Sequence, residues 1–149
     1  MTNTASPVDL VVDTSAVLAI LLPEAEGPQF YNRLRAAHCP ALSAANKLET
    51  LMVLLSRQPE SAEALFAKLQ HSLALRILEV DDAIADQAIA AFIRYGKSRH
   101  PAGLNFGDCF SYALAKHFNA PLLYKGNDFA QTDIPSAGGW GPGTPKPNF

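Results

Sequence analysis

Four acidic residues, each beside an apolar segment, are the groups best suited to chemistry in this chain of 149 residues. They are Asp13, Glu49, Asp108 and Asp128. Carboxylates that gather in one place cannot all stay ionised without compensation, and a divalent cation supplies it. Oxygen ligands favour Mg²⁺ or Mn²⁺, and such an ion suits phosphodiester hydrolysis because it polarises the phosphate and lowers the pKa of a bound water. The pattern predicts this chemistry if the fold brings the four acids together.

Each acid also has an ordinary structural explanation. Asp13 ends the short apolar run over residues 8–12 and, taken alone, fits a strand-end or capping acid equally well. Glu49 fits a helix surface residue, and Asp108 fits a first-turn acid stabilised by the helix dipole. Asp108, however, is flanked by core-type residues, and an acid at a buried edge needs a partner or a metal. The surrounding elements therefore decide between the two interpretations.

Strands and helices are expected to alternate along the chain. Apolar runs predict strands at residues 8–12, 39–43, 75–80 and 120–123, and a short last one at 132–134. Periodic apolar residues predict helices at 16–22, capped by Thr14 or Ser15, and at 24–37, 44–57, 61–72, 83–95 and 105–116. This alternation predicts an α/β fold, a three-layer α/β/α sandwich with a central, mostly parallel sheet. In such a sheet the four acids belong to the carboxyl edge, where ligands bind.

Two of the expected helices have clear apolar stripes. The helix over residues 44–57 carries Leu48, Leu51, Met52 and Leu55 at the i, i+3, i+4, i+7 spacing. The helix over 105–116 carries Phe106, Cys109, Phe110, Ala113 and Leu114 on one face. Both patterns are typical of amphipathic helices, and each helix also carries one of the four acids.

Composition restricts the classes of partner. The net charge of −2 provides no overall basic field, so attraction of a nucleic acid would rest on local basic side chains and metal ions. Lys125, Lys116 and Arg99 are candidate phosphate contacts, and the hydroxyls of Thr14 and Ser15 are candidates to orient a water. The charged fraction of 17%, against an average of about 25%, indicates that a partner covers part of the surface.

Several other classes of protein lose support. Two distant cysteines and four scattered histidines give no zinc-type spacing, and there is no Walker loop, GxGxxG or GxSxG motif. The first nine residues lack the regions of a signal peptide, and no apolar run approaches the roughly 18 residues of a membrane span. We therefore expect a single-domain cytoplasmic protein with no membrane segment.

Four motifs, taken in order, resemble those of PIN-domain toxins of type II toxin–antitoxin modules, the VapC family. They are Val12-Asp13-Thr14-Ser15, Ser43…Leu48-Glu49, Leu104-Asn105-Phe106-Gly107-Asp108-Cys109…Tyr112-Ala113-Leu114-Ala115 and Lys125-Gly126-Asn127-Asp128-Phe129…Thr132-Asp133. The resemblance covers residues 8–134. It implies a PIN domain over residues 1–134, followed by a Gly/Pro-rich tail over 135–149 that has no counterpart in the family core.

The resemblance also implies a function. The activity would be Mg²⁺- or Mn²⁺-dependent endoribonuclease cleavage of tRNA or another translation-related RNA, which arrests translation. The acidic quartet of the family falls on Asp13, Glu49, Asp108 and Asp128. Members usually form homodimers and are held inactive by a VapB antitoxin whose C-terminal segment covers the active-site groove.

Three other functions stay open at the level of the residues. A metal-dependent phosphatase with an aspartyl nucleophile commonly has a second acid two residues later, where this chain has Ser15. A DNA nuclease of similar architecture, or a PIN-like binding module without catalysis, is also possible, although all four acids are present. Asp133 is interpreted as a turn residue rather than as a fifth acid of the site.

Overall fold

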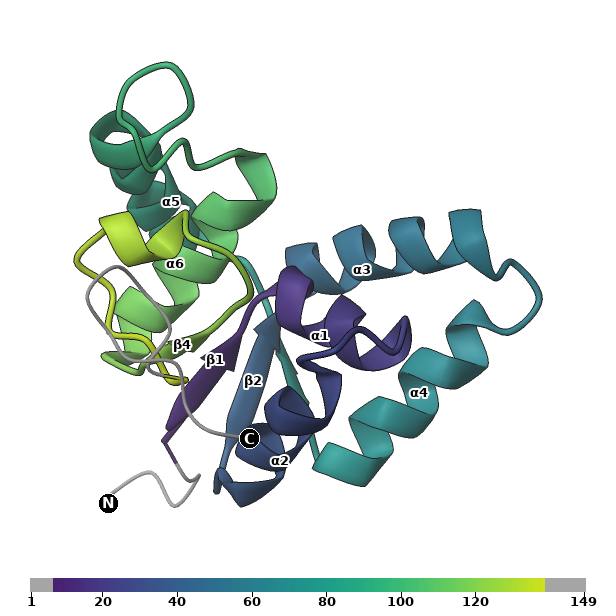
Figure 1. The fold of residues 1–149 in the computed structure, drawn as a ribbon. Coiled ribbons are helices and arrows are strands. Elements are labelled where there is room, and N and C mark those ends of the chain that lie inside the picture. Colours follow the sequence, from purple (N-terminus) through teal and green to yellow (C-terminus); the bar gives the residue numbers. More distant parts are fainter. Residues whose placement is uncertain (1–6, 139–149) are drawn as a thin grey trace.

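The computed structural model describes residues 7–138, which form a parallel sheet enclosed by helices (Figure 1). The strands in this range are β1 (Leu10–Val12), β2 (Pro40–Ser43), β3 (Arg76–Leu78) and β4 (Leu122–Leu123). The helices are α1 (Thr14–Leu21), α2 (Gly27–Ala36), α3 (Ala44–Arg57), α4 (Ala62–Leu73), α5 (Asp82–Tyr95), α6 (Phe106–Phe118) and a 3₁₀ turn at Phe129–Gln131.

The sheet places β1 in its interior. The strand order is β3-β2-β1-β4, with Leu10 opposite Pro40 on one side and Val12 opposite Leu123 on the other. All the pairings between strands are parallel, which confirms the α/β prediction. Asp13, which follows β1 directly, therefore lies at the carboxyl edge with strands on both sides.

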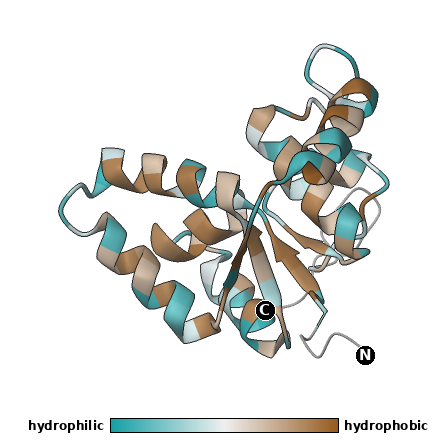
Figure 2. Cartoon of the chain, turned by 180° about the vertical axis from the view of Figure 1, so that it is seen from behind, coloured by the Kyte–Doolittle hydropathy of each residue, from teal (hydrophilic) through white to brown (hydrophobic). Residues whose placement is uncertain are grey.

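Two apolar clusters cover the two faces of the sheet. Val11 belongs to the cluster with α5 and α6, whereas Leu10 and Val12 belong to the cluster with α1–α4. This division follows from the strand geometry, because successive side chains point to opposite faces. In Figure 2 the strands are largely brown, which marks them as apolar, and helices lie on both sides. The three-layer sandwich is confirmed.

The predicted strand over 132–134 is wrong. The Thr132 hydroxyl donates to the Phe129 carbonyl (2.6 Å) and accepts the Ile134 N–H (3.2 Å), so side-chain bonds hold this segment in a turn. β4 instead bonds to the residues that follow: the Leu122 N–H donates to Pro135 and the Ala137 N–H donates to Leu122, each at 2.9 Å. The rest of the tail, with Trp140 and Phe149, lies outside the described residues.

The start of α1 also differs from the prediction. The helix begins at Thr14, because the carboxylate of Asp13, and not a hydroxyl of Thr14 or Ser15, caps it by accepting the Ser15 N–H (3.0 Å). Asp13 is thus a helix cap, as one of the two interpretations holds, and it also lies at the carboxyl edge of the sheet.

The apolar stripe of α3 faces outward. Leu48 and Met52 are each 63% exposed, while the buried residues of the helix are Asn46, Thr50 and Leu54. The inner face of α3 meets α1 through a hydroxyl, since Thr14 donates to the Asn46 carbonyl (3.3 Å), while Thr50 donates to the same carbonyl from within α3 (2.7 Å). On α6, in contrast, most of the expected apolar face is buried, and only Phe106 is strongly exposed (81%).

Within residues 7–138, every helix is too short or too polar to cross a bilayer.

Candidate active site

Asp13 is buried at the carboxyl edge, with only 4% of its surface exposed. One carboxylate oxygen accepts the Ser15 N–H (3.0 Å) and the other accepts the Ser111 hydroxyl (2.5 Å). Burial raises the pKa of Asp13 above its ordinary value, an effect that the hydrogen bonds from Ser111 and Ser15 oppose and that the charge of Glu49 strengthens. The fold therefore fixes this acid precisely but leaves its charge poorly compensated.

Asp108 lies in the first turn of α6, where local sequence holds it. Its carboxylate accepts the Asn105 N–H (3.0 Å) while the Asn105 side chain accepts the Asp108 N–H (2.9 Å), a reciprocal capping box. Burial raises the pKa of Asp108 to about 7, opposed by the Asn105 N–H and strengthened by the charges of Asp13, Asp128 and Glu49. Asp108, like Asp13, therefore carries a negative charge that its surroundings disfavour.

Glu49 reaches the same place from the second turn of α3. The Asn46 side-chain amide donates to the Glu49 carboxylate (3.2 Å) and to the backbone carbonyl of Gly107 (3.0 Å). Because Gly107 precedes Asp108 on α6, this one amide holds the acid of α3 beside the acid of α6. The Asn46 amide thus links the carboxyl group of Glu49 to the first turn of α6, which carries Asp108.

Asp128 is the exposed member of the set. It follows β4 through a short loop and precedes the 3₁₀ turn, and its side chain makes no capping bond there. Its charge contributes to the raised pKa of Asp108, which places its carboxylate near the other acids.

The fold brings all four predicted acids to one edge of the sheet. Three of them raise the pKa of the fourth, and every donor is a carboxylate oxygen, so the set fits a hard divalent cation such as Mg²⁺ or Mn²⁺. Within residues 7–138, no three His, Cys, Asp or Glu side chains already stand in the tight arrangement of a formed metal site. The four carboxylates would therefore have to move closer together to hold an ion.

Sequence reasoning missed two buried polar residues that support the acids. Asn46 is fully buried, and its side-chain oxygen accepts the hydroxyl of Ser43 (2.6 Å). Ser111, also fully buried, lies within hydrogen-bond distance of both Asp13 (2.5 Å) and the Asn46 oxygen (3.1 Å). The helical spacing could have found them, because Asn46 precedes Glu49 by three residues and Ser111 follows Asp108 by three.

Residues 10–135 match the family model of the PIN domain. The chain belongs to the PIN domain family. Its curated relatives are VapC ribonucleases. VapC30 of Mycobacterium tuberculosis is 44% identical over 125 residues, which are 84% of this chain and 95% of that protein. VapC of Mycolicibacterium smegmatis is 42% identical over 125 residues, 84% of this chain and 97% of that protein. Within the PIN domains, the chain therefore belongs to the VapC family.

Solved structures of low sequence identity share the fold. VapC20 of Mycobacterium tuberculosis, described as a sarcin-ricin loop cleaving toxin, aligns with a TM-score of 0.68 at 20% identity, over 85% of this chain and 96% of that one. A toxin–antitoxin complex from Klebsiella pneumoniae aligns with a TM-score of 0.66 at 17% identity, over 84% and 93% of the two chains.

The predicted supporting residues of this PIN domain have mixed positions. Thr14 is buried and its hydroxyl is committed to the Asn46 carbonyl, so it holds α1 on α3. The Ser15 hydroxyl accepts the Lys125 N–H (2.9 Å), which ties the loop after β4 to the start of α1. The Lys125 ammonium forms ion pairs with Glu24 and with Glu26.

Lys116 and Arg99 are not brought into the group of acids. Lys116 lies eight residues beyond Asp108 on α6, about 12 Å along the helix, and forms an ion pair with Asp133 (2.8 Å). Arg99 is exposed in the loop before α6, where it donates to the Ile93 carbonyl (3.2 Å).

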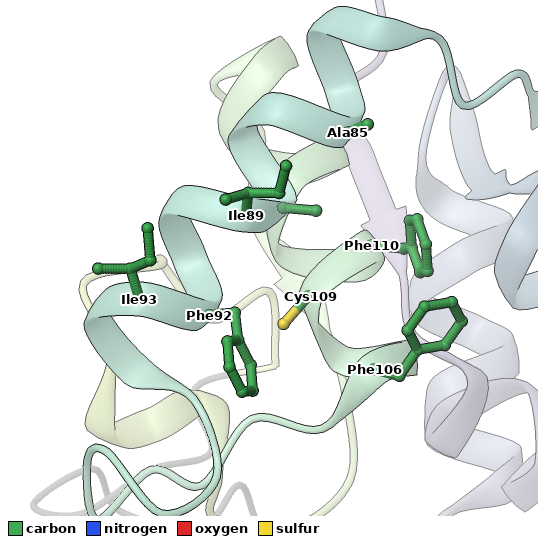
Figure 3. Close-up of a pocket in the computed structure, with 8 residues that line it drawn as sticks. Ala85, Ile89, Phe92, Ile93, Phe106, Cys109 and Phe110 are labelled. Atoms are coloured by element: carbon green, nitrogen blue, oxygen red, sulfur yellow. The ribbon is translucent and has the colours of Figure 1, made fainter.

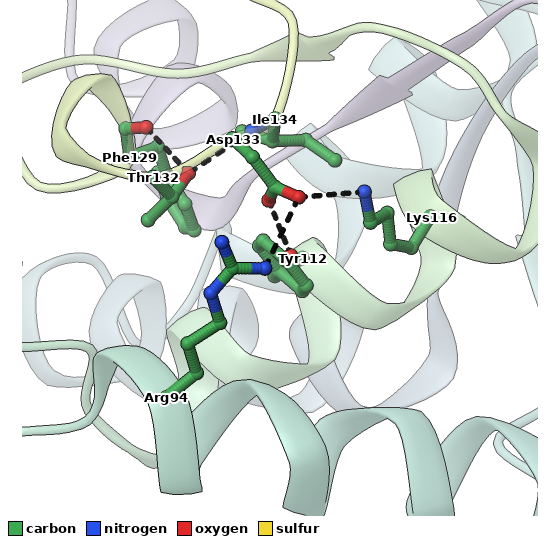
Figure 4. A network of polar contacts seen from close by, with 7 residues as sticks. All are labelled: Arg94, Tyr112, Lys116, Phe129, Thr132, Asp133 and Ile134. Atoms are coloured by element: carbon green, nitrogen blue, oxygen red, sulfur yellow. Dashed lines mark hydrogen bonds and ion pairs between the residues drawn. The ribbon is translucent and has the colours of Figure 1, made fainter.

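Asp133 does more than form a turn. Its carboxylate accepts the Tyr112 hydroxyl (2.5 Å) and pairs with Lys116 and Arg94, so it connects the C-terminal segment to α5 and α6 (Figure 4). These cationic and hydroxyl partners hold the pKa of Asp133 below its ordinary value, although partial burial opposes them. Asp133 is therefore a structural anchor, and its partners are not the four acids.

An apolar groove runs along the surface where α5 packs against α6 in this PIN domain. Its volume is about 420 Å³, and Figure 3 shows the aromatic and aliphatic side chains that line it. They are Ala85, Ala88, Ile89, Phe92, Ile93, Phe106, Cys109 and Phe110. Together with the outward stripe of α3, this groove leaves large apolar side chains in contact with solvent.

Proposed function

We propose that this VapC-family PIN domain is a Mg²⁺- or Mn²⁺-dependent endoribonuclease and the toxin of a type II toxin–antitoxin module. The observation that carries the proposal is the placement of four acids at one edge of the sheet, where burial beside the other three raises the pKa of Asp108 to about 7. Such a cluster has excess negative charge that a divalent cation neutralises. Relatives at 41–44% identity are named VapC ribonucleases, which supports RNA as the substrate.

Asp13, Glu49, Asp108 and Asp128 would hold the ion. When bound, it polarises a phosphodiester phosphate and lowers the pKa of a water. The chain itself supplies rigid positioning: Ser111 and the Ser15 N–H hold Asp13, Asn105 holds Asp108, and Asn46 holds Glu49. Lys125, whose backbone N–H bonds the Ser15 hydroxyl at this edge, would exchange its half-buried glutamate partners for a substrate phosphate.

We further propose two protein partners, a second copy of the chain and a VapB-type antitoxin. Apolar patches on monomeric proteins mark interaction sites when they are large. Strongly exposed apolar residues of this kind are Leu48, Met52, Ile89, Ile93 and Phe106. Cytoplasmic location agrees with an RNA substrate and with the two free, buried cysteines.

The experiment compares the wild-type chain with Asp13→Asn, since asparagine keeps the helix cap but removes the charge. Each chain is expressed in bacteria, growth is followed, and the 5′ ends of cellular RNA are sequenced. We expect arrest and discrete new RNA ends with the wild type alone. The purified wild type should cleave the RNA so identified with Mg²⁺ or Mn²⁺ and fail with EDTA.

Three outcomes would contradict the proposal. Growth and RNA ends that stay unchanged at verified expression would favour a binding module. Cleavage of single-stranded DNA in place of RNA would identify a DNA nuclease. Equal activity of wild type and Asp13→Asn would show that the acids at the sheet edge are not the active site.

A further inference from the structure

Gly107, the second residue of α6, lies directly against the carboxyl group of Glu49. A β-carbon built on Gly107 would stand 2.6 Å from Cδ and 2.7 Å from Oε1 of Glu49, and closer still to Oε2. Real β-carbons do not approach other heavy atoms so closely. Glu49 can therefore occupy its present position only because residue 107 has no side chain.

Backbone conformation does not explain this glycine. Among the described glycines, positive φ angles occur at Gly103 and Gly126 but not at Gly107, which lies within helix α6. Alanine is a better helix former than glycine at such a position. A contact, and not a turn, is thus the physical reason for a glycine at this point of α6.

The same amide that bonds Glu49 also bonds Gly107. Asn46 donates to the Glu49 carboxylate (3.2 Å) and to the Gly107 carbonyl (3.0 Å), and Asn46 is fully buried. The amide draws the Glu49 carboxylate toward α6, and the bare α-carbon of Gly107 provides the space for it. Asp108, the next residue, then lies close enough for the Glu49 charge to affect its pKa.

We propose that Gly107 is a positioning residue that sets the distance between the acid of α3 and the acid of α6. The inference rests on the proposed function, because it concerns the ion that these acids would hold. Any side chain at position 107 displaces the Glu49 carboxylate from α6 and opens the cluster. Shortening Glu49 by one methylene removes the overlap.

The test uses four full-length chains: wild type, Gly107→Ala, Glu49→Asp and the double variant. Mn²⁺ affinity is measured by titration calorimetry with the metal alone, RNA cleavage by kcat and KM, and the fold by metal-free thermal unfolding. We expect Gly107→Ala to weaken Mn²⁺ binding and kcat by about 10- to 100-fold, the range seen when residues that orient ligands are changed. Its metal-free Tm should equal or exceed that of the wild type.

The Glu49→Asp background provides the matched control. In this background the added β-carbon meets no carboxylate, so Gly107→Ala should change Mn²⁺ affinity and kcat by less than about twofold. A smaller effect here than in the wild type would show that positions 49 and 107 are coupled. If Gly107→Ala lowered Mn²⁺ affinity and kcat equally in the wild-type and Glu49→Asp chains, its effect would act through the backbone and the inference would be overturned. A drop in Tm on Gly107→Ala that persists in the Glu49→Asp chain would mean the same.

Failure of this inference and failure of the proposed function are distinguishable. A wild type that binds Mn²⁺ and cleaves RNA, beside a Gly107→Ala chain that does both equally well, overturns only the role of Gly107. A wild type that neither binds Mn²⁺ nor cleaves RNA overturns the proposed function, and the inference with it.

Discussion

Helices α3 and α6 each contribute one acid to the site, yet they bury opposite kinds of side chain. On α6 the apolar residues Cys109, Ala113 and Leu114 are buried in the cluster beside the sheet. On α3 the apolar residues Leu48 and Met52 face outward and the buried positions include Asn46 and Thr50. The same amphipathic pattern thus lies against the core in one helix and faces away from it in the other.

The difference has a structural cause and a functional use. α6 packs on the sheet, where burial of apolar area is favourable, whereas the first turns of α3 contact α1 and α6 through hydroxyl and amide groups. Directional hydrogen bonds fix a helix more narrowly than apolar packing does. The polar face of α3 therefore positions Glu49, while its apolar stripe stays exposed.

The largest expected effect follows removal of the acid on α6. Asp108→Asn should lower the rate of RNA cleavage by at least about 100-fold, because this group stands among all the other carboxylates and would be an ion ligand. Its free energy of unfolding should not fall, since a repelling charge is removed. Cleavage kinetics and urea denaturation measure the two effects.

Asp86→Asn is the matched control for this experiment. Asp86 is an exposed acid in the middle of α5, so its amide variant should keep the wild-type rate. Wild-type activity in Asp108→Asn, or an equal loss in Asp86→Asn, would remove Asp108 from the site.

The second prediction tests the orientation of α3. Leu54 is fully buried and Met52 is 63% exposed, although both are apolar residues of one helix. Leu54→Ala should lower the free energy of unfolding by about 2–5 kcal/mol. Met52→Ala should change it by less than about 0.5 kcal/mol. Urea denaturation at two protein concentrations separates folding from association. Similar losses of unfolding free energy in Leu54→Ala and Met52→Ala would mean that the apolar stripe of α3 is buried within the monomer.

Most of the fold could be predicted from the sequence, because in most elements the residues that the local apolar pattern selects are the ones that the fold buries. The apolar run before Asp13, the helix start at Asn105 and the alternation of strands and helices all indicate a parallel sheet with acids at its carboxyl edge. The outward stripe of α3 was not predictable, since helical periodicity identifies an apolar face but not the element that covers it. That choice depends on tertiary contacts.

The supporting residues of the site escaped prediction for a related reason. Helical spacing places Asn46 beside Glu49 and Ser111 beside Asp108, but no local motif shows that Ser111 bonds Asp13 and Asn46, which lie 98 and 65 residues away in the sequence. At residues 132–134 a local pattern misled the prediction. A strand was expected there, but the Thr132 hydroxyl bonds nearby backbone groups and the segment forms a turn.

The third prediction concerns the amide that joins the two helices. Asn46→Ala removes the donor to Glu49 and Gly107 and leaves buried hydroxyls of Ser43 and Ser111 with fewer partners. We expect a loss of about 1–3 kcal/mol in the free energy of unfolding. Cleavage should fall by about 10- to 100-fold through the misplaced Glu49.

The exposed Asn32 of α2 is the control for the amide variant. Asn32→Ala should change the free energy of unfolding by less than about 0.5 kcal/mol and leave cleavage unchanged. If Asn46→Ala were as stable and as active as Asn32→Ala, the polar face of α3 would have no part in positioning Glu49.

The smallest expected effect is the dependence of metal-free stability on pH. Because the pKa of Asp108 is about 7 in the folded protein and 3.8 ordinarily, the folded state binds its proton more tightly than the unfolded state does. Stability should therefore rise as pH falls from 8 to 6, by on the order of 1 kcal/mol for this partly exposed group. The raised pKa of Asp13 acts in the same direction.

Thermal unfolding of the wild type and of Asp108→Asn at pH 6 and pH 8 isolates this group. The carboxylates of Asp9 and Asp133 have lowered pKa values, so their stabilising contributions are lost only at more acidic pH and do not affect this window. The asparagine variant should show a smaller rise in Tm on acidification, and Mg²⁺ should raise the Tm of the wild type more at pH 8, where the cluster is ionised. If both chains showed the same dependence of Tm on pH, the charge of Asp108 would already be compensated within the protein. The contrast between the hydrogen-bonded polar groups of α3 and the uncompensated acid of α6 would then no longer hold.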